Sequence, residues 1–406
     1  MRITYLSDER YPSQETDTEQ VVNTVAALAR RGVTIRLCTL AANDALVDHR
    51  ALAEYYQVEG SFEARQVSVP SSLPRVLEKL TYAVRAARTT GGDADVLYTR
   101  NLPIVVAGLL AGHRVVYDHF RAWPDQYPPL QPLLRAAFAH PRFLGAFFHS
   151  RFARDSFARL GLPEERLAVV HNGWDPRRME PRLDRSAARG CVGIESAGPM
   201  ITYVGRVAPR KGLNSVLAMA RLMPEAMFVI VGSEGDGPVE QEARAVSNVR
   251  VVPWQRFDAT VPYLYAADVL LLPPSLGPLA QGSTVLPMKL FGYLAAGRPI
   301  LAPEAPDTAE LLKDGSNAIL VAPNPDAAVA GLRELLADPA ACDRLALGAL
   351  QTARGLTWDA RAERIDGLLT QWLQAPPADS PRAQWSAFGW AIQSARWAFG
   401  REPGAG

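Results

Sequence analysis

The sequence has few cysteines, no excess of one charge and no long apolar run, and each absence excludes a class of protein. Its 3 cysteines (Cys38, Cys191 and Cys342) lie far apart and form no CxxC pair, which excludes a disulfide framework and a zinc ribbon. The 43 basic and 42 acidic residues give a net charge of +1, so bulk charge does not indicate a nucleic-acid-binding protein. The longest apolar run, at 102–111, is too short to span a bilayer.

The first residues lack the apolar segment that a secretory signal peptide requires. Together with the sparse cysteines, this start predicts a cytoplasmic protein, either free in solution or peripheral at the inner face of the membrane. A length of 406 residues with 48% apolar residues is typical of a globular chain of two or three domains.

Short apolar strands alternate with helices along two stretches of the chain. The first stretch predicts strands at 3–6, 33–40, 96–98, 115–117, 146–149 and 167–170. The second predicts strands at 201–204, 227–231, 249–252, 269–272 and 300–302. Buried strands that alternate with helices form parallel sheets covered on both faces. We therefore expect an α/β chain of two doubly wound, Rossmann-like domains that face a cleft.

The stretch 177–198 carries much Arg, Gly and Pro without apolar periodicity, which predicts a linker. This places one domain at 1–176 and a second domain at 199–375. The remaining tail, 376–406, contains Trp385, Trp390 and Trp397, whose large apolar side chains need burial.

The segment ITYVGRVAPRKG at 201–212 is the strongest motif. A strand ends at Gly205 and Arg206, and Lys211 opens the next helix after a short loop. Two cations and free helix N–H groups at one strand end suit a diphosphate. The segment lacks the GxxxxGK[ST] pattern of a Walker loop. Read alone, it is also compatible with a solvated surface turn.

Three further segments are weak when taken singly. They are VIVGSEGDG at 229–237, VVHNGWD at 169–175 and STVLPMKLFGYLAAGRP at 283–299. The first is most simply an ordinary glycine-rich turn. The second is either a plain turn or a hinge, and the third is either a packed helix or a helix N-terminus that faces a phosphate.

In this order, the segments resemble the retaining GT-B glycosyltransferases, in particular glycosyltransferase family four. The likeness extends to YLYAADVLLLPPS and to AELLKDGSNAILV. It implies that Arg206 and Lys211 hold the donor diphosphate, and that His119 in VVYDHF lies close to the transferred sugar. It also implies a set of donor-binding residues: Gly205, Pro253, Trp254, Gln255, Thr284, Val285, Leu286, Met288 and Lys289.

The resemblance implies transfer of a sugar, with retention, from a nucleotide-sugar donor to a glycan, lipid or small-molecule acceptor. Such a hexosyltransferase would serve polysaccharide or glycoconjugate biosynthesis. We expect no cofactor besides the nucleotide-sugar substrate. We also expect no metal, because no cluster of side chains with the spacing of metal ligands stands out beside the motifs above.

Two positions depart from the family pattern, which usually has glutamates eight residues apart where this chain has Thr284 and Gly292. The second glutamate normally holds the ribose hydroxyls. An alternative is therefore a catalytically impaired binding or partner subunit on the same fold. A nucleotide-sugar epimerase is a further alternative.

Three features bear on the acceptor and on partners. Leu73, Val76, Leu77, Leu80 and Val84 form a stripe with basic flanks at 73–88, either a solvated domain helix or a membrane-surface helix. The aromatic stretch 384–399 either crosses back to the N-terminal domain or contacts a dimer partner or a membrane. Trp123 and Tyr127 lie in a proline-rich loop that would suit an acceptor pocket. His119 is also open to a purely structural interpretation, paired with its neighbour Asp118.

Overall fold

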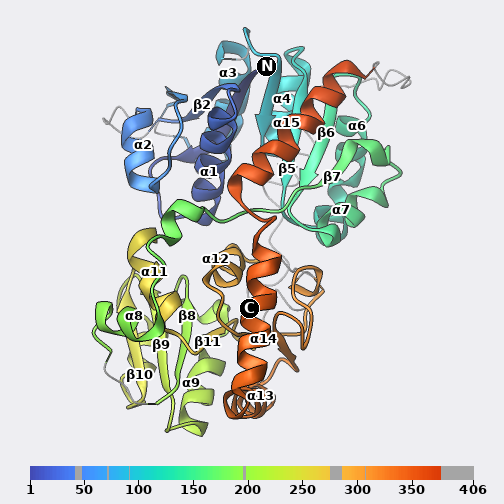
Figure 1. The fold of residues 1–406 in the computed structure, drawn as a ribbon. Helices are drawn as coiled ribbons and strands as arrows, with labels where there is room; N and C mark the ends of the chain where they lie inside the picture. The colour runs from blue at the N-terminus through green and yellow to red at the C-terminus, as the bar shows by residue number, and fades with distance from the viewer. Residues whose placement is uncertain are drawn as a thin grey trace. The chain divides into compact units, whose positions relative to one another are not determined.

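The computed structural model describes residues 1–375 apart from 42–47, 71–72, 91, 195–197, 275–285 and 307. The chain divides into two compact units (Figure 1). Unit 1 is Met1–His171 together with the segment from Arg361, and unit 2 is Asn172–Ala360. The predicted α/β architecture of two doubly wound domains is confirmed by the sheets described below.

Within the described residues of unit 1, seven strands form one parallel sheet in the order β3-β2-β1-β4-β5-β6-β7. They are β1 (Arg2–Arg10), β2 (Thr34–Leu40), β3 (Glu63–Val67), β4 (Val96–Thr99), β5 (Val115–His119), β6 (Phe143–Phe148) and β7 (Leu167–Val169). The direction of winding reverses between β1 and β4. Ligands of such sheets bind beside the carboxyl ends of the strands at a reversal of this kind.

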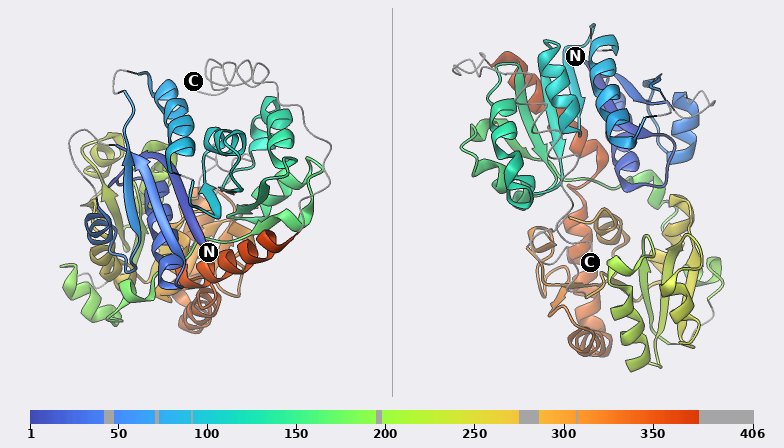
Figure 2. Two further views of the ribbon diagram at one scale, coloured as in Figure 1. Left: turned by 90° about the horizontal axis from the view of Figure 1, so that it is seen from above. Right: turned by 180° about the vertical axis from the view of Figure 1, so that it is seen from behind.

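Helices cover both faces of the sheet of unit 1. They are α1 (Thr16–Arg30), α2 (His49–Tyr56), α3 (Arg75–Thr90), α4 (Leu102–Leu110), α5 (Trp123–Gln126), α6 (Gln131–Phe138), α7 (Arg151–Ala158) and α15 (Trp358–Gln374). The 3-10 turn η1 (Pro128–Leu130) lies between α5 and α6, and η2 (Glu164–Arg166) lies between α7 and β7. Figure 2 shows α3, α4 and α6 on one face and α1 with α15 on the other.

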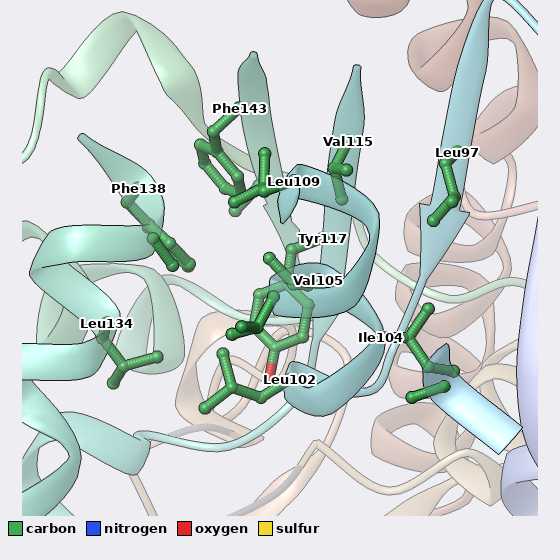
Figure 3. Close-up of a cluster of buried hydrophobic side chains, with 14 of the residues drawn as sticks. Leu97, Leu102, Ile104, Val105, Leu109, Val115, Tyr117, Leu134, Phe138 and Phe143 are labelled. Atoms are coloured by element: carbon green, nitrogen blue, oxygen red, sulfur yellow. The ribbon is translucent and has the colours of Figure 1, made fainter. Parts of the chain in front are cut away.

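One core cluster of unit 1 fills the space between the sheet and helices α3, α4 and α6. Figure 3 shows Leu109 and Val105 of α4 directed toward Phe138 of α6 and Phe143 of β6. The Phe138 and Phe143 rings stack with centroids 4.2 Å apart. The apolar strands predicted from the sequence therefore bury both faces, as a parallel sheet requires.

Unit 2 has a second parallel sheet of six strands among its described residues, in the order β10-β9-β8-β11-β12-β13. The strands are β8 (Met200–Val204), β9 (Met227–Ser233), β10 (Val249–Pro253), β11 (Val269–Leu271), β12 (Ile300–Pro303) and β13 (Ile319–Val321). Its winding reverses between β8 and β11. The residues after β8 therefore stand at the switch point of this unit.

The described helices of unit 2 also lie in two layers. Residues of α8 (Arg185–Cys191), α11 (Phe257–Ala266) and α12 (Lys289–Ala296) share one core cluster with residues of the strands. Residues of α9 (Leu213–Leu222), α10 (Pro238–Ala243) and α13 (Pro325–Ala337) share the other. Helix α14 (Pro339–Ala353) contributes to both clusters. The 3-10 turns are η3 (Pro176–Met179), η4 (Pro209–Lys211) and η5 (Thr308–Glu310).

Glycine ends α12 as the sequence motif predicts. Gly297 adopts φ +61°, in the left-handed region, and terminates the helix. A Cβ at this position would also lie 2.7 Å from Cγ of Leu350 on α14. Close packing and backbone conformation therefore both require glycine at this position.

The boundaries of the two units differ from those of the domains expected at 1–176 and 199–375. The range 177–198 contains η3 and α8, and Ala188, Val192 and Ile194 join the core of unit 2. The chain returns to unit 1 at Arg361, within α15. The tail 376–406, including the aromatic stretch 384–399, lies outside the described residues.

Candidate functional site

Two glycines bring the carboxyl ends of β8 and β9 close together. Gly205 follows β8 with φ +147°, and Gly232 in β9 has φ +119°. A Cβ on Gly232 would lie 2.4 Å from the carbonyl oxygen of Gly205, and a Cβ on Gly205 would lie 2.5 Å from Nζ of Lys289. Only glycine allows this approach of backbone and amine. Gly205 therefore occupies a crowded point at the switch of the sheet.

The predicted diphosphate residues Arg206 and Lys211 both follow β8. The Arg206 side chain is 27% exposed, and its Nε donates to Oε1 of Glu234 at 3.0 Å. Lys211 ends η4, and Gly212, with φ +73°, is the N-cap of α9. The helix thus begins where the motif predicts. The ion pair with Glu234, which comes from the loop after β9, could not be read from the motif.

Lys289 is the first residue of α12, and its amine lies beside the same strand end. Its Nζ sits 3.6 Å from the ring centroid of Tyr203 in β8. Partial burial and the charge of Lys211 hold the pKa of Lys289 well below its usual range. The structure shows no carboxylate partner for this amine within the described residues, and the segment 275–285 contains no acidic residue. Two neighbouring amines carry like charges, and a bound anion would relieve their repulsion.

The remaining donor-binding candidates divide between β10 and α12. Pro253 ends β10, the backbone N–H of Trp254 donates to Ser233 O at 2.7 Å, and Gln255 Nε2 donates to Pro253 O at 3.2 Å. These three positions share a sheet edge with Gly205. Leu286 is buried and Met288 is the N-cap of α12. Thr284 and Val285 lie outside the described residues.

Gly292, which replaces an expected glutamate, has space for a side chain. It lies in α12 and is partly exposed. A Cβ there would meet one atom of the described chain within 4 Å, Cδ1 of Leu264 at 3.7 Å, an ordinary contact. Packing therefore does not enforce glycine at this position.

His119 ends β5 in unit 1, as predicted, but it is only 1% exposed. Its Nδ1 bonds to the Tyr117 hydroxyl at 2.9 Å, and its ring centroid lies 4.3 Å from that of Trp123. Burial and the charge of Arg100 hold the pKa of His119 well below its usual range, so the ring is neutral at pH 7. A neutral, enclosed imidazole suits a hydrogen bond to a ligand better than proton abstraction.

The alternative that His119 pairs with Asp118 is wrong, because consecutive strand residues point to opposite faces of a sheet. Asp118 instead bonds to His149 Nε2 through Oδ1 at 2.8 Å and to Arg361 through Oδ2 at 2.6 Å. The Tyr98 hydroxyl also donates to Oδ2 at 2.8 Å. This buried cluster had no sequence signal, because Arg361 lies 243 positions from Asp118.

The HNGWD turn packs against the chain that enters α15. A Cβ on Gly173 would lie 2.4 Å from the carbonyl carbon of Thr357. Trp174 donates its backbone N–H to Leu356 O at 3.0 Å and its indole N–H to Ala353 O at 2.8 Å. The turn therefore binds the first residues of unit 2 to the final residues of the same unit. Its role is structural.

Among the described residues, no group of three or more His, Cys, Asp and Glu side chains is arranged to hold a metal ion. None of the described helices combines the length and apolar character that a membrane span requires.

Two family models match the chain. "Glycosyltransferase Family 4" matches residues 18–178, and "Glycosyl transferases group 1" matches residues 198–338. The D-inositol 3-phosphate glycosyltransferase of Mycolicibacterium gilvum is 30% identical over 219 residues, which is 50% of this chain and 46% of the relative. That of Streptomyces bingchenggensis is 31% identical over 223 residues, 50% of this chain and 47% of the relative. The chain thus matches about half the length of these relatives.

Solved structures share the fold over almost the whole chain. Sucrose-phosphate synthase from Thermosynechococcus elongatus aligns with a TM-score of 0.73 at 17% identity, covering 91% of this chain and 98% of the other. Anabaena HepE in complex with UDP-glucose aligns with a TM-score of 0.66 at 17% identity, covering 91% and 100%. At this identity the likeness shows the fold alone, which is GT-B.

Proposed function

The chain belongs to the family 4, group 1 glycosyltransferases, and on this premise we propose that it transfers a sugar, with retention, from a nucleoside diphosphate sugar to an acceptor. One observation carries the proposal: Arg206, Lys211 and Lys289 gather at the carboxyl end of β8, and the Lys289 amine has no carboxylate partner within the described residues. A diphosphate would supply the missing negative charge.

Electrostatics accounts for the catalytic contribution of this cluster. When the bond between the anomeric carbon and the diphosphate oxygen breaks, negative charge grows on the leaving group. Fixed cations aimed at that charge stabilise the transition state more than the ground state. Glu234 orients Arg206 through the 3.0 Å hydrogen bond. The partial burial of Lys289 strengthens its attraction to an anion.

The comparisons support the donor class. HepE, which shares the fold, was solved with UDP-glucose, and the curated relatives are named as transferases to an inositol phosphate. We propose a nucleotide-sugar donor here and a glycan, lipid or small-molecule acceptor, with no nucleic acid as partner.

Two substitutions test the phosphate assignment. Lys211→Ala and Arg206→Ala are expected to lower sugar transfer by two or more orders of magnitude, because each removes a donor worth about 2.7–4 kcal/mol of barrier. Arg210→Ala is the matched control, since Arg210 is exposed beside Lys211 in η4. Thermal shift against a panel of nucleoside diphosphates, followed by donor hydrolysis, gives the readout. Wild-type rates in the first two variants would refute the assignment.

Gly292 favours a second candidate, a binding or partner subunit that holds a nucleotide without turnover. The position lacks the glutamate although packing leaves room for one. Stabilisation by a nucleoside diphosphate without hydrolysis or transfer of any matching nucleotide sugar would select this candidate over the enzyme.

We also propose that transfer needs no metal, because charge at the site comes from side chains. Activity that survives dialysis against EDTA supports this. Activity that is lost on dialysis and restored by Mg²⁺ or Mn²⁺ contradicts it.

We propose a peripheral contact between α3 and an anionic membrane at the inner face. On this helix Leu77 is 50% exposed and Val84 is 40% exposed, and Arg85 and Arg88 are exposed beside them. A basic helix with an exposed apolar face binds anionic lipid surfaces. Lys79 does not contribute, because it pairs with Asp8 and Glu9.

Sedimentation with phosphatidylglycerol vesicles tests this contact. Leu77→Glu together with Val84→Glu is expected to abolish co-sedimentation, while Leu347→Glu, an exposed leucine of α14, leaves it unchanged. No binding by the wild-type chain removes the proposal.

A further inference from the structure

The carboxyl ends of β4 and β5 in unit 1 carry a second group of cations, distinct from that after β8. Arg100 follows β4, and Phe120 and Arg121 follow β5. These strands are neighbours in the sheet and lie beside its switch point. The mechanism proposed for the donor diphosphate uses none of these residues.

Two guanidinium groups share one aromatic ring. Cζ of Arg100 lies 4.9 Å from the centroid of Phe120, and Cζ of Arg121 lies 5.7 Å from it. Both distances fall within the range of cation–π attraction. Phe120 therefore positions both arginines, although their like charges repel.

Among the described residues, a carboxylate forms an ion pair with only one of these two arginines. Arg100 bonds to the Asp17 carboxylate at 3.4 Å and to the Asp17 carbonyl oxygen at 3.3 Å. Arg121 has no ion-pair partner within the described residues and is partly exposed. Asp118, the other nearby carboxylate, is fully buried and already accepts from Arg361. One positive charge at this edge is thus left for a ligand.

Several buried polar atoms gather in the same place without a hydrogen-bond partner among the described residues. They are Nε of Arg100, Nε of Arg121, Nε2 of His119 and Nε1 of Trp123. Three are obligatory donors, and the neutral His119 ring can also donate. Leaving such an atom buried without a partner costs about 1–3 kcal/mol, and native proteins keep few of them. Four at one strand edge indicate a ligand rich in oxygen acceptors.

We propose that this edge binds an oxyanion, a phosphate or carboxylate, carried by a polyhydroxylated acceptor, with Arg121 as its principal contact. The guanidinium group matches both oxyanions through two parallel N–H groups. The Trp123 indole N–H then donates to a hydroxyl group of the same molecule. The term acceptor rests on the proposed function, whereas the anion site rests on unit 1 alone.

Calorimetry with small probes tests the site while a nucleoside diphosphate saturates unit 2. Inorganic phosphate, glucose 6-phosphate and glucuronate are compared with neutral glucose. The wild-type chain is expected to bind the anions in the millimolar range or better and glucose at least tenfold more weakly. Preference for glucose 6-phosphate over glucuronate selects a phosphate, and the reverse selects a carboxylate.

Arg121→Ala is expected to weaken anion binding at least tenfold, and Arg121→Lys to restore part of it. Arg114→Ala is the matched control, because Arg114 is exposed at the amino end of the same strand. Binding of the nucleoside diphosphate should stay unchanged in all three variants, which separates this site from the proposed donor site. Equal binding of charged and neutral probes, no binding of any anion, or unchanged binding by Arg121→Ala overturns the proposal.

Discussion

At the scale of single residues, the Asp118 carboxylate links side chains from distant parts of unit 1. It is fully buried and accepts hydrogen bonds from Tyr98, His149 and Arg361. Burial alone would raise the pKa of this carboxyl, but the charge of Arg361 and the bond from His149 hold it well below its usual range. The carboxylate is therefore ionised at all working pH values and joins β5, β6 and α15.

Removing this charge should strongly destabilise unit 1. Asp118→Asn leaves the Arg361 guanidinium buried without a counter-ion, which costs about 3–5 kcal/mol. Urea unfolding, followed by hydrogen exchange in β5, measures the loss. Glu363→Gln is the control, because Glu363 is exposed in its weak pair with Arg31 and should change stability little. Similar stability in the two variants would contradict this prediction.

The His149 ring makes the stability of unit 1 depend on pH. Burial lowers the pKa of His149 to about 4, although Asp118 opposes the shift. The unfolded chain, with a histidine pKa near 6.5, takes up this proton first as the pH falls. The stabilisation is therefore complete above about pH 6.5 and is lost as the pH falls toward 4, by roughly 3 kcal/mol.

Comparison with His149→Gln isolates this contribution. Burial raises the pKa of Asp8 to about 6, so Asp8 makes the folded state more stable as the pH falls through the same range. Because Asp8 is present in both proteins, its effect cancels in the comparison. The difference in unfolding free energy between wild type and variant should shrink as the pH falls from 7 to 4. A difference that does not change with pH would show that His149 is not neutral in the native state.

At the scale of elements, sequence patterns predicted what depends on local order and missed what depends on distant partners. The strand ends at Gly205 and His119 and the start of α9 were predictable, because apolar runs and glycines mark them locally. Helix α8 was not, because seven residues offer only two turns and its Arg and Gly residues hide the periodicity. The pair of Arg361 with Asp118 was not predictable, because nothing in either segment specifies its partner.

Helix α12 offers a direct test of the missing glutamate. Gly292→Glu is expected to fold and to raise stability by up to about 1 kcal/mol, since glycine is a poor helix former and the position has room. If the nucleoside binds in the orientation that the resemblance implies, the new carboxylate should tighten nucleoside diphosphate binding about tenfold. Gly367→Glu, in α15 of unit 1 with open space around it, is the control for helix propensity alone.

At the scale of the whole molecule, α15 makes unit 1 discontinuous in sequence. Trp372 stacks on Phe147 with ring centroids 5.1 Å apart, and its indole N–H donates to Glu165 O at 2.9 Å. Gly145 in β6 has no side chain where one would lie 2.7 Å from that indole. The sheet is therefore shaped to receive a helix that follows the strands of unit 2 in the sequence.

This dependence predicts the behaviour of the fragment 1–171. Without α15 the fragment exposes Phe147 and leaves Asp118 buried without Arg361, a loss of about 3 kcal/mol or more. We expect it to be partly unfolded, with weak protection of β5 and β6 amides from hydrogen exchange. A peptide of residues 358–375 should restore that protection when added in trans, and the same peptide with Arg361→Ala and Trp372→Ala should not. If the β5 and β6 amides of the fragment alone are fully protected, the sheet is stable without α15. If both peptides restore protection equally, helix formation supplies the stability, and the Arg361 and Trp372 side chains do not.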